Sequence, residues 1–229
     1  MPDDLIPYLT AGGPERSSTP EWIADALRSA VTDGRCPPGS RLREEHIAGA
    51  MKVSRNSVRE AFRLLVHERL LVYELNRGVF VRTLTAADVT DLYRIRRLLE
   101  GGAVRTATPE TLAAALPAVA AALTAAGAAA ERDDWPAVGT ANMHFHQGIA
   151  ALAGSRRVDD TMRQVLAELR LVFHVMSLPR HFHEPYLDGN RTLYAHLAAG
   201  DLDAARRHLD DYLHDAERQL LAAFSAAAR

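Results

Sequence analysis

The sequence predicts a mainly α protein, with three short helices and a β-hairpin at the N-terminus and an all-α bundle after them. Three observations predict this class. Apolar residues recur at helical spacing in three segments before residue 70, two short β-prone runs follow, and every long segment after residue 84 has a helical pattern. Hydrophobic residues make up 48% of the 229, and much of that share is alanine, a strong helix former.

We expect three parts in the chain: a mobile tail over residues 1–16, a first domain over 17–83 and a second domain over 84–229. The tail mixes Pro, Gly and Asp without periodicity. Leu84-Thr85-Ala86-Ala87-Asp88 is the expected linker and the next helix start.

The first domain is expected to begin with two helices. Thr19-Pro20-Glu21 has an N-cap residue followed by proline at the first helical position, and Asp33-Gly34 ends the helix. Pro37-Pro38-Gly39-Ser40 is a rigid turn. A second short helix is expected from about Glu44 to Met51, and it leads into a third.

The third helix, which starts after Ser54, is the strongest functional candidate. Ser54 is a favoured N-cap residue, and the expected buried stripe is Val53, Val58, Ala61, Phe62 and Leu65. The N-terminal end of this helix, largely off the stripe, carries Arg55, Asn56, Ser57 and Arg59. A helix that reads the major groove presents base-contacting side chains there, and its amides favour a phosphate. An ordinary amphipathic helix with a solvated basic face shares this pattern, so the flanking sequence decides between them.

That flanking sequence predicts a hairpin. Leu71-Val72-Tyr73-Glu74 and Val79-Phe80-Val81-Arg82 are β-prone, and Asn76-Arg77-Gly78 lies between them as a turn. Three helices followed by a hairpin make a winged helix-turn-helix. The turn has the size and charge to enter a minor groove or bind a phosphate, although a plain hairpin turn would look similar.

The charge distribution permits DNA binding. The net charge of −2 argues against it by itself, but residues 17–82 carry 11 Lys and Arg against 8 Asp and Glu, a net charge of +3. Lys52 is the sole lysine, so phosphate contacts must come from arginine. Cys36 is the only cysteine, which excludes an internal disulfide and fits a reducing cytoplasm.

We expect neither a membrane span nor a signal peptide. We expect no apolar run to reach the roughly 20 residues that a span needs, and the N-terminus has no basic segment followed by an apolar one. The expected location is therefore cytoplasmic.

Several motifs of the first domain resemble the GntR family of bacterial transcription regulators. They are Asp33-Gly34-Arg35, Pro38-Gly39-Ser40-Arg41-Leu42, Val53-Ser54-Arg55, Val58-Arg59-Glu60-Ala61, and Asn76-Arg77-Gly78 with Phe80-Val81. The resemblance implies DNA-contacting positions at Arg43, Ser54, Arg55, Asn56, Ser57, Arg59 and Gly78. Asn56-Ser57 stands where the family commonly has Thr-Pro, which affects the expected operator sequence and not DNA binding.

Physical chemistry separates the roles of these residues. Arg55 or Arg59 can give a guanine a bidentate contact at O6 and N7. Arg43 and Arg77 suit phosphates, which set the register without reading sequence. This hypothesis requires that acidic neighbours in the fold do not engage Arg55 and Arg59.

The second domain is expected to be all-α. The expected helices cover residues 88–106, 109–130, 135–153 and 156–176, a segment ending near Ala199, and residues 201–228. Pro117 is expected to shorten or kink its helix.

The second domain also resembles one branch of the same family. The motifs are Leu92-Tyr93-Arg94-Ile95-Arg96-Arg97-Leu98-Leu99-Glu100, Phe145-His146, and Gly200-Asp201 with Ala204-Ala205. They are similar to the FadR-like branch, whose effector domain is called FCD. The resemblance implies a small organic acid, or a related metabolite, bound inside the bundle. In many members it also implies a divalent metal, held by an Asp-x-x-x-His pair and two later histidines.

The metal positions are poorly matched in this chain. They fall on Asn142, His146, Asn190 and Tyr212, so one of four expected ligands remains. We therefore expect no cofactor and a degraded family-type metal site. A register error is an open alternative, because His196, His208 and His214 are close in sequence.

The same four side chains are candidates to bind the effector directly. They are polar and can line one cavity as hydrogen-bond partners, and Arg96 can clamp a carboxylate. The alternative is that they are surface groups or satisfied core contacts.

The sequence thus predicts a homodimeric, ligand-responsive repressor that binds an inverted-repeat DNA operator. An enzyme is not expected, because the chain has no nucleophile elbow, P-loop, dinucleotide fingerprint or complete metal set. The alternative function is a constitutive DNA-binding protein with a purely structural bundle.

Overall fold

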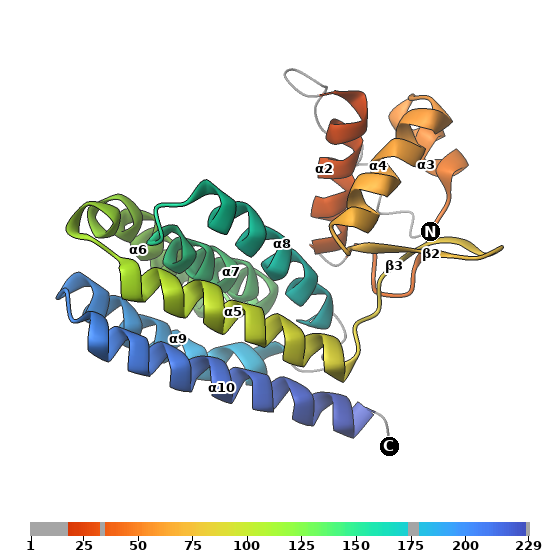
Figure 1. Ribbon diagram of the computed structural model, residues 1–229. Helices are drawn as coiled ribbons and strands as arrows, with labels where there is room; N and C mark the ends of the chain where they lie inside the picture. Colours follow the sequence, from red (N-terminus) through yellow and green to blue (C-terminus); the bar gives the residue numbers. More distant parts are fainter. Residues whose placement is uncertain (1–17, 33–34, 174–178, 228–229) are drawn as a thin grey trace. The chain divides into compact units, whose positions relative to one another are not determined.

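The computed structural model describes residues 18–32, 35–173 and 179–227 (Figure 1). Contacts divide the chain into two units, Met1–Leu84 with Ala167–Val175, and Thr85–Leu166 with Met176–Arg229. The tail expected over residues 1–16 lies outside the described residues.

The first unit contains the expected winged helix-turn-helix, which is confirmed. Its helices are α2 (Thr19–Thr32), α3 (Glu44–Met51) and α4 (Arg55–His67). The wing strands β2 (Leu71–Glu74) and β3 (Gly78–Val81) pair antiparallel, and Leu71 faces Val81. A third strand, β1 (Arg41–Leu42), joins the other side of β3 and was not expected, because two residues are too short to show a period.

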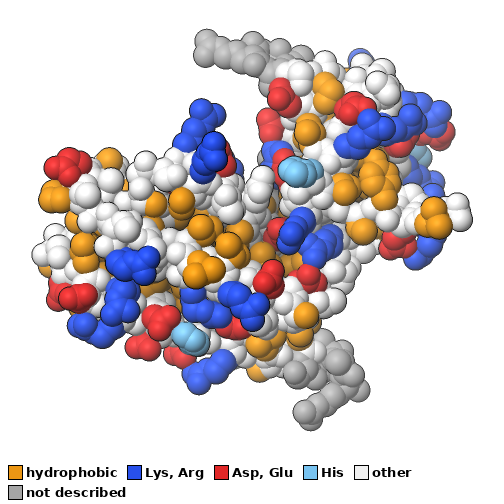
Figure 2. Space-filling view, viewed as in Figure 1, with side chains coloured by type: hydrophobic (Ala, Val, Ile, Leu, Met, Phe, Trp, Pro, Cys, Tyr) orange, Lys and Arg blue, Asp and Glu red, His pale blue; other side chains and the backbone are white. Residues whose placement is uncertain are grey.

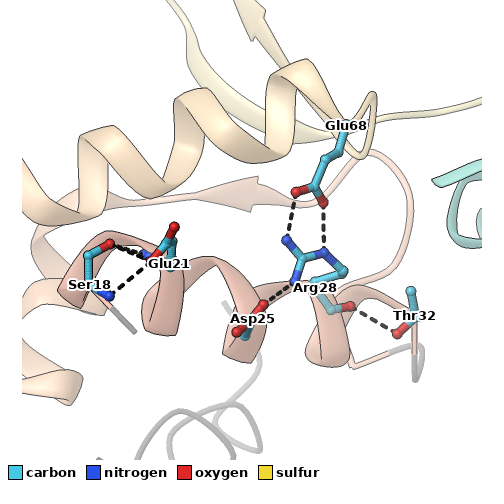
Figure 3. A network of polar contacts seen from close by, with 6 residues as sticks. All are labelled: Ser18, Glu21, Asp25, Arg28, Thr32 and Glu68. Carbon is cyan, nitrogen blue, oxygen red and sulfur yellow. Dashed lines mark hydrogen bonds and ion pairs between the residues drawn. The ribbon is translucent and has the colours of Figure 1, made fainter. Parts of the chain in front are cut away.

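Polar contacts fix both ends of α2 (Figure 3). The helix begins at Thr19, one residue earlier than expected, because Ser18 is its N-cap: the Ser18 amide donates to Glu21 and the Glu21 amide to Ser18 Oγ. Near its other end, Arg28 donates from Nε and Nη2 to both carboxylate oxygens of Glu68, at 2.7 and 2.6 Å. Glu68 directly follows α4, so this fork ties α2 to the end of the third helix.

Helix α4 has the cap and most of the apolar stripe that the sequence predicts. Ser54 is the N-cap and its Oγ accepts from the Ser57 amide at 3.0 Å. The buried side chains of the helix are Val58, Ala61, Phe62 and Leu65. Val53 is a correction: it precedes the helix and is only half-buried, because the chain turns at Lys52, whose φ is +55°.

After residue 84 the chain forms the expected helices, with ends within two or three residues of the expected ones wherever they are described. They are α5 (Ala86–Thr106), α6 (Pro109–Glu131), α7 (Trp135–Ala151), α8 (Arg156–Phe173), α9 (Pro179–Ala198) and α10 (Leu202–Ala227). The last part of α8, from Ala167, belongs to the first unit. The end expected for α8 at Met176 lies outside the described residues. Pro117 lies inside α6 without ending it.

The bundle is built around α5 and α7. Helix α5 packs against α7 and α10, while α6 packs against α7 and α9. Helices α6 and α7 approach closely at Gly148, where an added Cβ would lie 2.7 Å from Val119 Cγ2. The core between these helices therefore requires a glycine there.

Helix α6 corrects one expectation. With 23 residues, it is long and apolar enough to cross a membrane by length and composition, contrary to the expectation that no segment is. The reason is its alanine content, which gives a low charge without bulky side chains. One such helix is a weak indication, because core helices also pass this test.

Candidate nucleic-acid interface and effector site

The N-terminal half of α4 presents its arginines outward. The side chains of Arg55 and Arg59 are 57% and 47% exposed, and both pair with glutamates of the first turn of α3. Arg55 Nη2 donates to Glu45. Arg59 donates from Nε and Nη2 to the two oxygens of Glu44, at 3.3 and 3.0 Å.

These pairs do not meet the condition set for DNA reading as stated, because both arginines have an acidic neighbour as partner. The pairs lie at the surface, however, where water and salt weaken them. The Glu44 carboxylate raises the pKa of Arg59, so this guanidinium stays charged. Both arginines are therefore engaged but not sequestered.

The other predicted contacts of α4 differ in exposure. Asn56 is exposed at the first turn. Ser54 is exposed but already caps the helix, and the half-buried Ser57 shares a 2.8 Å hydroxyl contact with it. Arg43, at the N-cap of α3, is exposed and has no ion pair among the residues that the structure describes, so it is free to meet a phosphate.

The wing carries Arg77 and Gly78. Arg77 is exposed, pairs with Glu74 and lies over the Phe80 ring at 5.2 Å. Gly78 has φ +106°, which other residues rarely adopt, and an added Cβ would lie 3.5 Å from the Arg41 guanidinium. Sequence reasoning missed Arg41 as a candidate contact because its position beside the wing depends on β1.

In the second unit, the five predicted effector residues do come together. Arg96 is on α5, Asn142 and His146 are on α7, Asn190 is on α9 and Tyr212 is on α10, and all five are buried.

Hydrogen bonds join these residues into one cluster. Asn142 Oδ1 accepts from Asn190 Nδ2 at 2.7 Å and from the Tyr212 hydroxyl at 3.2 Å. The same hydroxyl lies 3.1 Å from His146 Nε2.

Glu100 completes this polar cluster. One of its oxygens accepts from Arg96 Nε at 2.8 Å, and the other lies 2.6 Å from His146 Nδ1. An ionised carboxylate only accepts, so the proton of neutral His146 belongs on Nδ1. The signal that could have identified Glu100 is its i, i+4 spacing from Arg96 on one helix.

Burial and charge act against each other in the cluster. Burial lowers the pKa of His146 more than the attraction of Glu100 raises it. Burial alone would raise the pKa of Glu100, but Arg96 and His146 together lower it. The Glu100 carboxylate is therefore ionised beside a charged guanidinium and a neutral imidazole.

Two polar atoms of the cluster are left over. Arg96 Nη2 and Asn190 Oδ1 are buried without a hydrogen-bond partner. Such atoms are rare in folded proteins, because an unmet buried donor or acceptor is costly. They mark a place where a further polar group would be stabilised.

The family-type metal does not fit these side chains. Asn142, Asn190 and Tyr212 are neutral, and both nitrogens of His146 already face polar partners. Nor do three or more His, Cys, Asp or Glu side chains gather to hold a metal anywhere in the described ranges.

A separate groove of about 210 Å³ lies on the second unit between α5 and α10. Its lining residues are Arg97, Leu98, Gly101, Gly102, Arg105, Arg206, Leu209, Asp210 and Leu213. None of the five predicted effector residues lines it, which makes this groove a distinct candidate for ligand binding.

Comparison with known proteins agrees with both units. Residues 19–81 match the gntR family of bacterial regulatory proteins, and residues 91–215 match the FCD domain. A GntR putative transcriptional regulator from Rhodococcus sp. RHA1 is a solved structure with 48% identity and a TM-score of 0.85, over 90% of this chain and 99% of that one.

Curated relatives extend this likeness. An uncharacterized HTH-type transcriptional regulator of Bacillus subtilis, YdhC, is 27% identical over 87% of this chain and 91% of its own. The gluconate operon transcriptional repressor of the same organism is 35% identical over 37% of this chain and 35% of its own. The chain belongs to the GntR family of bacterial regulators, with an FCD domain, and it is a DNA-binding transcription regulator and not an enzyme.

Proposed function

We propose that the protein is a repressor whose affinity for its operator is controlled by a small organic acid, or a related metabolite, bound in the polar cluster of the bundle. The effector contacts would be Arg96, Asn142, His146, Asn190 and Tyr212. The protein acts as a homodimer on an inverted repeat, since a twofold protein matches a twofold site. It works in the cytoplasm, away from membranes and without a bound metal.

The observation that carries this proposal is the pair of buried, unpartnered atoms, Arg96 Nη2 and Asn190 Oδ1. One is a donor and the other an acceptor, so a ligand that satisfies both must bring an acceptor and a donor. A hydroxy acid does so: a carboxylate oxygen accepts from Arg96, and a hydroxyl donates to Asn190.

On the DNA side, we propose that α4 reads the major groove and that the wing and α3 hold the backbone. Arg55 or Arg59 contacts a guanine, while Arg43 and Arg77 neutralise phosphates. The remaining contacts, which line the same surface, are Ser54, Asn56, Ser57 and Gly78.

Ligand and DNA are coupled through the opening of the cluster. We propose that an acid binding at Arg96 displaces the Asn142–Asn190 and Tyr212–Asn142 hydrogen bonds, which join α7 to α9 and α10. The effector changes operator affinity only to the extent that it binds this opened state more tightly than the closed one.

The test uses a duplex selected in vitro by the wild-type protein. Hydroxy acids are first screened by thermal shift, and hits are then tested for release of that duplex. Asn190→Ala should weaken the response at least tenfold while DNA affinity without acid is kept. Arg105→Ala, in the α5–α10 groove, is the matched control and should respond normally. If Arg105→Ala loses the response and Asn190→Ala keeps it, the effector binds in the groove.

A second candidate function is constitutive DNA binding with a structural bundle. It is favoured by the mutual hydrogen bonds of Asn142, Asn190, Tyr212 and His146, which close the cluster on itself. Operator binding that ignores every acid tested would support it.

A further inference from the structure

Four arginines of α4 and the wing have a glutamate partner. The pairs are Arg55–Glu45, Arg59–Glu44, Arg63–Glu60 and Arg77–Glu74. On the face that Figure 2 shows, basic and acidic side chains lie side by side on this unit. The pairs are not equivalent, and the difference separates Arg55 from Arg59.

Arg59 is held along one side of its guanidinium. Nε and Nη2 both donate to Glu44, at 3.3 and 3.0 Å, which is a side-on fork across two helices and 15 residues of sequence. This fork leaves a free edge, the end of the guanidinium where one hydrogen of Nη1 and the second hydrogen of Nη2 point outward in parallel. Since the side chain is 47% exposed, the free edge has room to meet a partner.

The free edge matches a guanine. Two parallel N–H donors on an arginine fit the O6 and N7 acceptors in the major groove, and a guanidinium fixed beforehand loses little rotamer freedom on binding. Arg55 lacks this arrangement, because it reaches Glu45 through Nη2 alone. Its guanidinium can still rotate about that single contact.

Resting on the proposed contact of α4 with the major groove, we propose that Glu44 is a positioning residue that presents the free edge of Arg59 to one guanine of the operator, and that Arg59 is the base reader of the pair. The Glu44 carboxylate keeps its two bonds to Arg59 when DNA binds, so the arginine enters the groove already oriented. The same carboxylate repels phosphates and makes Arg59 a poor partner for the DNA backbone. Glu44 thus raises binding to the correct sequence and lowers binding to any other.

The adjacent Glu45 provides a matched control. Glu44→Gln and Glu45→Gln change the charge equally, in the same turn of α3. Gln cannot accept the fork with both of its terminal atoms, so Glu44→Gln releases the side-on contact. Glu45→Gln removes a single contact and leaves the Arg59 fork in place.

Affinity is measured for a duplex selected in vitro by the wild-type protein and for a random-sequence duplex, over a range of salt concentrations and without effector. For Glu44→Gln we expect about tenfold weaker binding to the selected duplex, from loss of an oriented guanine contact. The affinity for the random duplex should stay the same or rise. The slope of its log affinity against log salt concentration should become steeper by about 0.9, because Arg59 now contacts a phosphate. For Glu45→Gln we expect severalfold tighter binding to both duplexes.

A second selection with Glu44→Gln gives a readout that a change in helix stability would not move. Preference for guanine should relax at one base pair of each half-site and persist elsewhere. Thermal unfolding confirms that α3 and α4 are intact. If Glu44→Gln instead behaves as Glu45→Gln does, with parallel gains on both duplexes and an unchanged selected sequence, Glu44 is only a surface charge and the proposal is wrong. Because no effector is used, this outcome does not depend on the proposed ligand site.

Discussion

The two units each contain an arginine paired with a glutamate, in opposite environments. Arg59 Nη2 lies 3.0 Å from Glu44 at the surface, and Arg96 Nε lies 2.8 Å from Glu100 in the core. In each case part of the guanidinium is left over: the free edge of Arg59 faces solvent, whereas Arg96 Nη2 is buried without a partner. Water can satisfy the first until DNA replaces it, but the second has only the protein or a ligand.

Burial, more than the identity of the partner, therefore decides what such a pair does. An exposed pair contributes little to stability and can be rearranged at little cost. Disruption of a buried pair lowers the stability of the fold strongly, because removal of one partner leaves an uncompensated charge in the core. The surface arginine is suited to recognition and the buried one to a switch that a ligand must open.

Removal of the buried carboxylate should have the largest effect on stability. Glu100→Ala leaves Arg96 charged in the core and takes the Nδ1 partner from His146. We expect the free energy of unfolding to fall by about 3–5 kcal/mol, measured by urea denaturation. Glu184→Ala removes the carboxylate of an exposed pair with Arg180 in the same unit and should cause no measurable change. Equal effects of the two substitutions would contradict the role of burial.

Removal of the surface arginine tests whether the exposed pair serves DNA recognition and not stability. Arg59→Ala should leave the unfolding transition unchanged, while discrimination between the selected and the random duplex falls about tenfold or more. Arg63→Ala, one turn further along α4 and also paired at the surface, is the control. Arg63→Ala should lower the affinity for both duplexes by a similar small factor. Unchanged discrimination in Arg59→Ala would exclude this residue as a base reader.

Acidification should destabilise the folded protein through two buried groups, His146 and Glu100. The lowered pKa of His146 means that the unfolded chain takes up a proton below about pH 6.5 and the folded chain does not, so stability is present above that pH and falls below it. The lowered pKa of Glu100 acts in the same direction at lower pH.

Each group adds at most about 1.4 kcal/mol per pH unit to the slope of the unfolding free energy. Urea denaturation of the wild type and of His146→Gln isolates the histidine, because the remaining histidines are common to both. Between about pH 7 and about pH 5, the wild type should lose more stability than the variant. Parallel profiles would mean that His146 titrates normally.

The sequence could predict most of the helices and the members of the polar cluster, because those features leave local signals. Ser54 caps α4 as its residue type indicates, and Gly200 lies at the expected helix end with φ +72°. Arg96, Asn142, His146, Asn190 and Tyr212 meet as hypothesised, since each sits on a helix whose position could be inferred.

What the sequence could not show depends on contacts between elements. Strand β1 exists only because β3 pairs with it. The fork from Arg59 to Glu44 crosses two helices, so nothing local separates Arg59 from Arg55. Arg96 was expected to be free for a carboxylate, but Glu100 already occupies its Nε. The residues of a site are thus easier to predict from the sequence than their hydrogen-bond and ion-pair partners.

The smallest expected effect is that of metal. Zn²⁺ or Ni²⁺ should not raise the melting temperature of the wild type, and a chelator should not lower it, because the cluster offers a single imidazole whose nitrogens face Glu100 and Tyr212. A rise that the chelator reverses would contradict this prediction and point to another ligand set.

A triple variant shows that the assay can detect a metal site. Asn142→Asp, Asn190→His and Tyr212→His together restore the ligand set of the family, and this variant should melt higher with Zn²⁺. Glu100 already holds His146 Nδ1, which is the arrangement that orients the other nitrogen toward a metal in many proteins. The buried pair would then support either a metal site or, as in this chain, a hydrogen-bonded cluster. The exposed pair of α4 should be unaffected by the substitutions and by Zn²⁺.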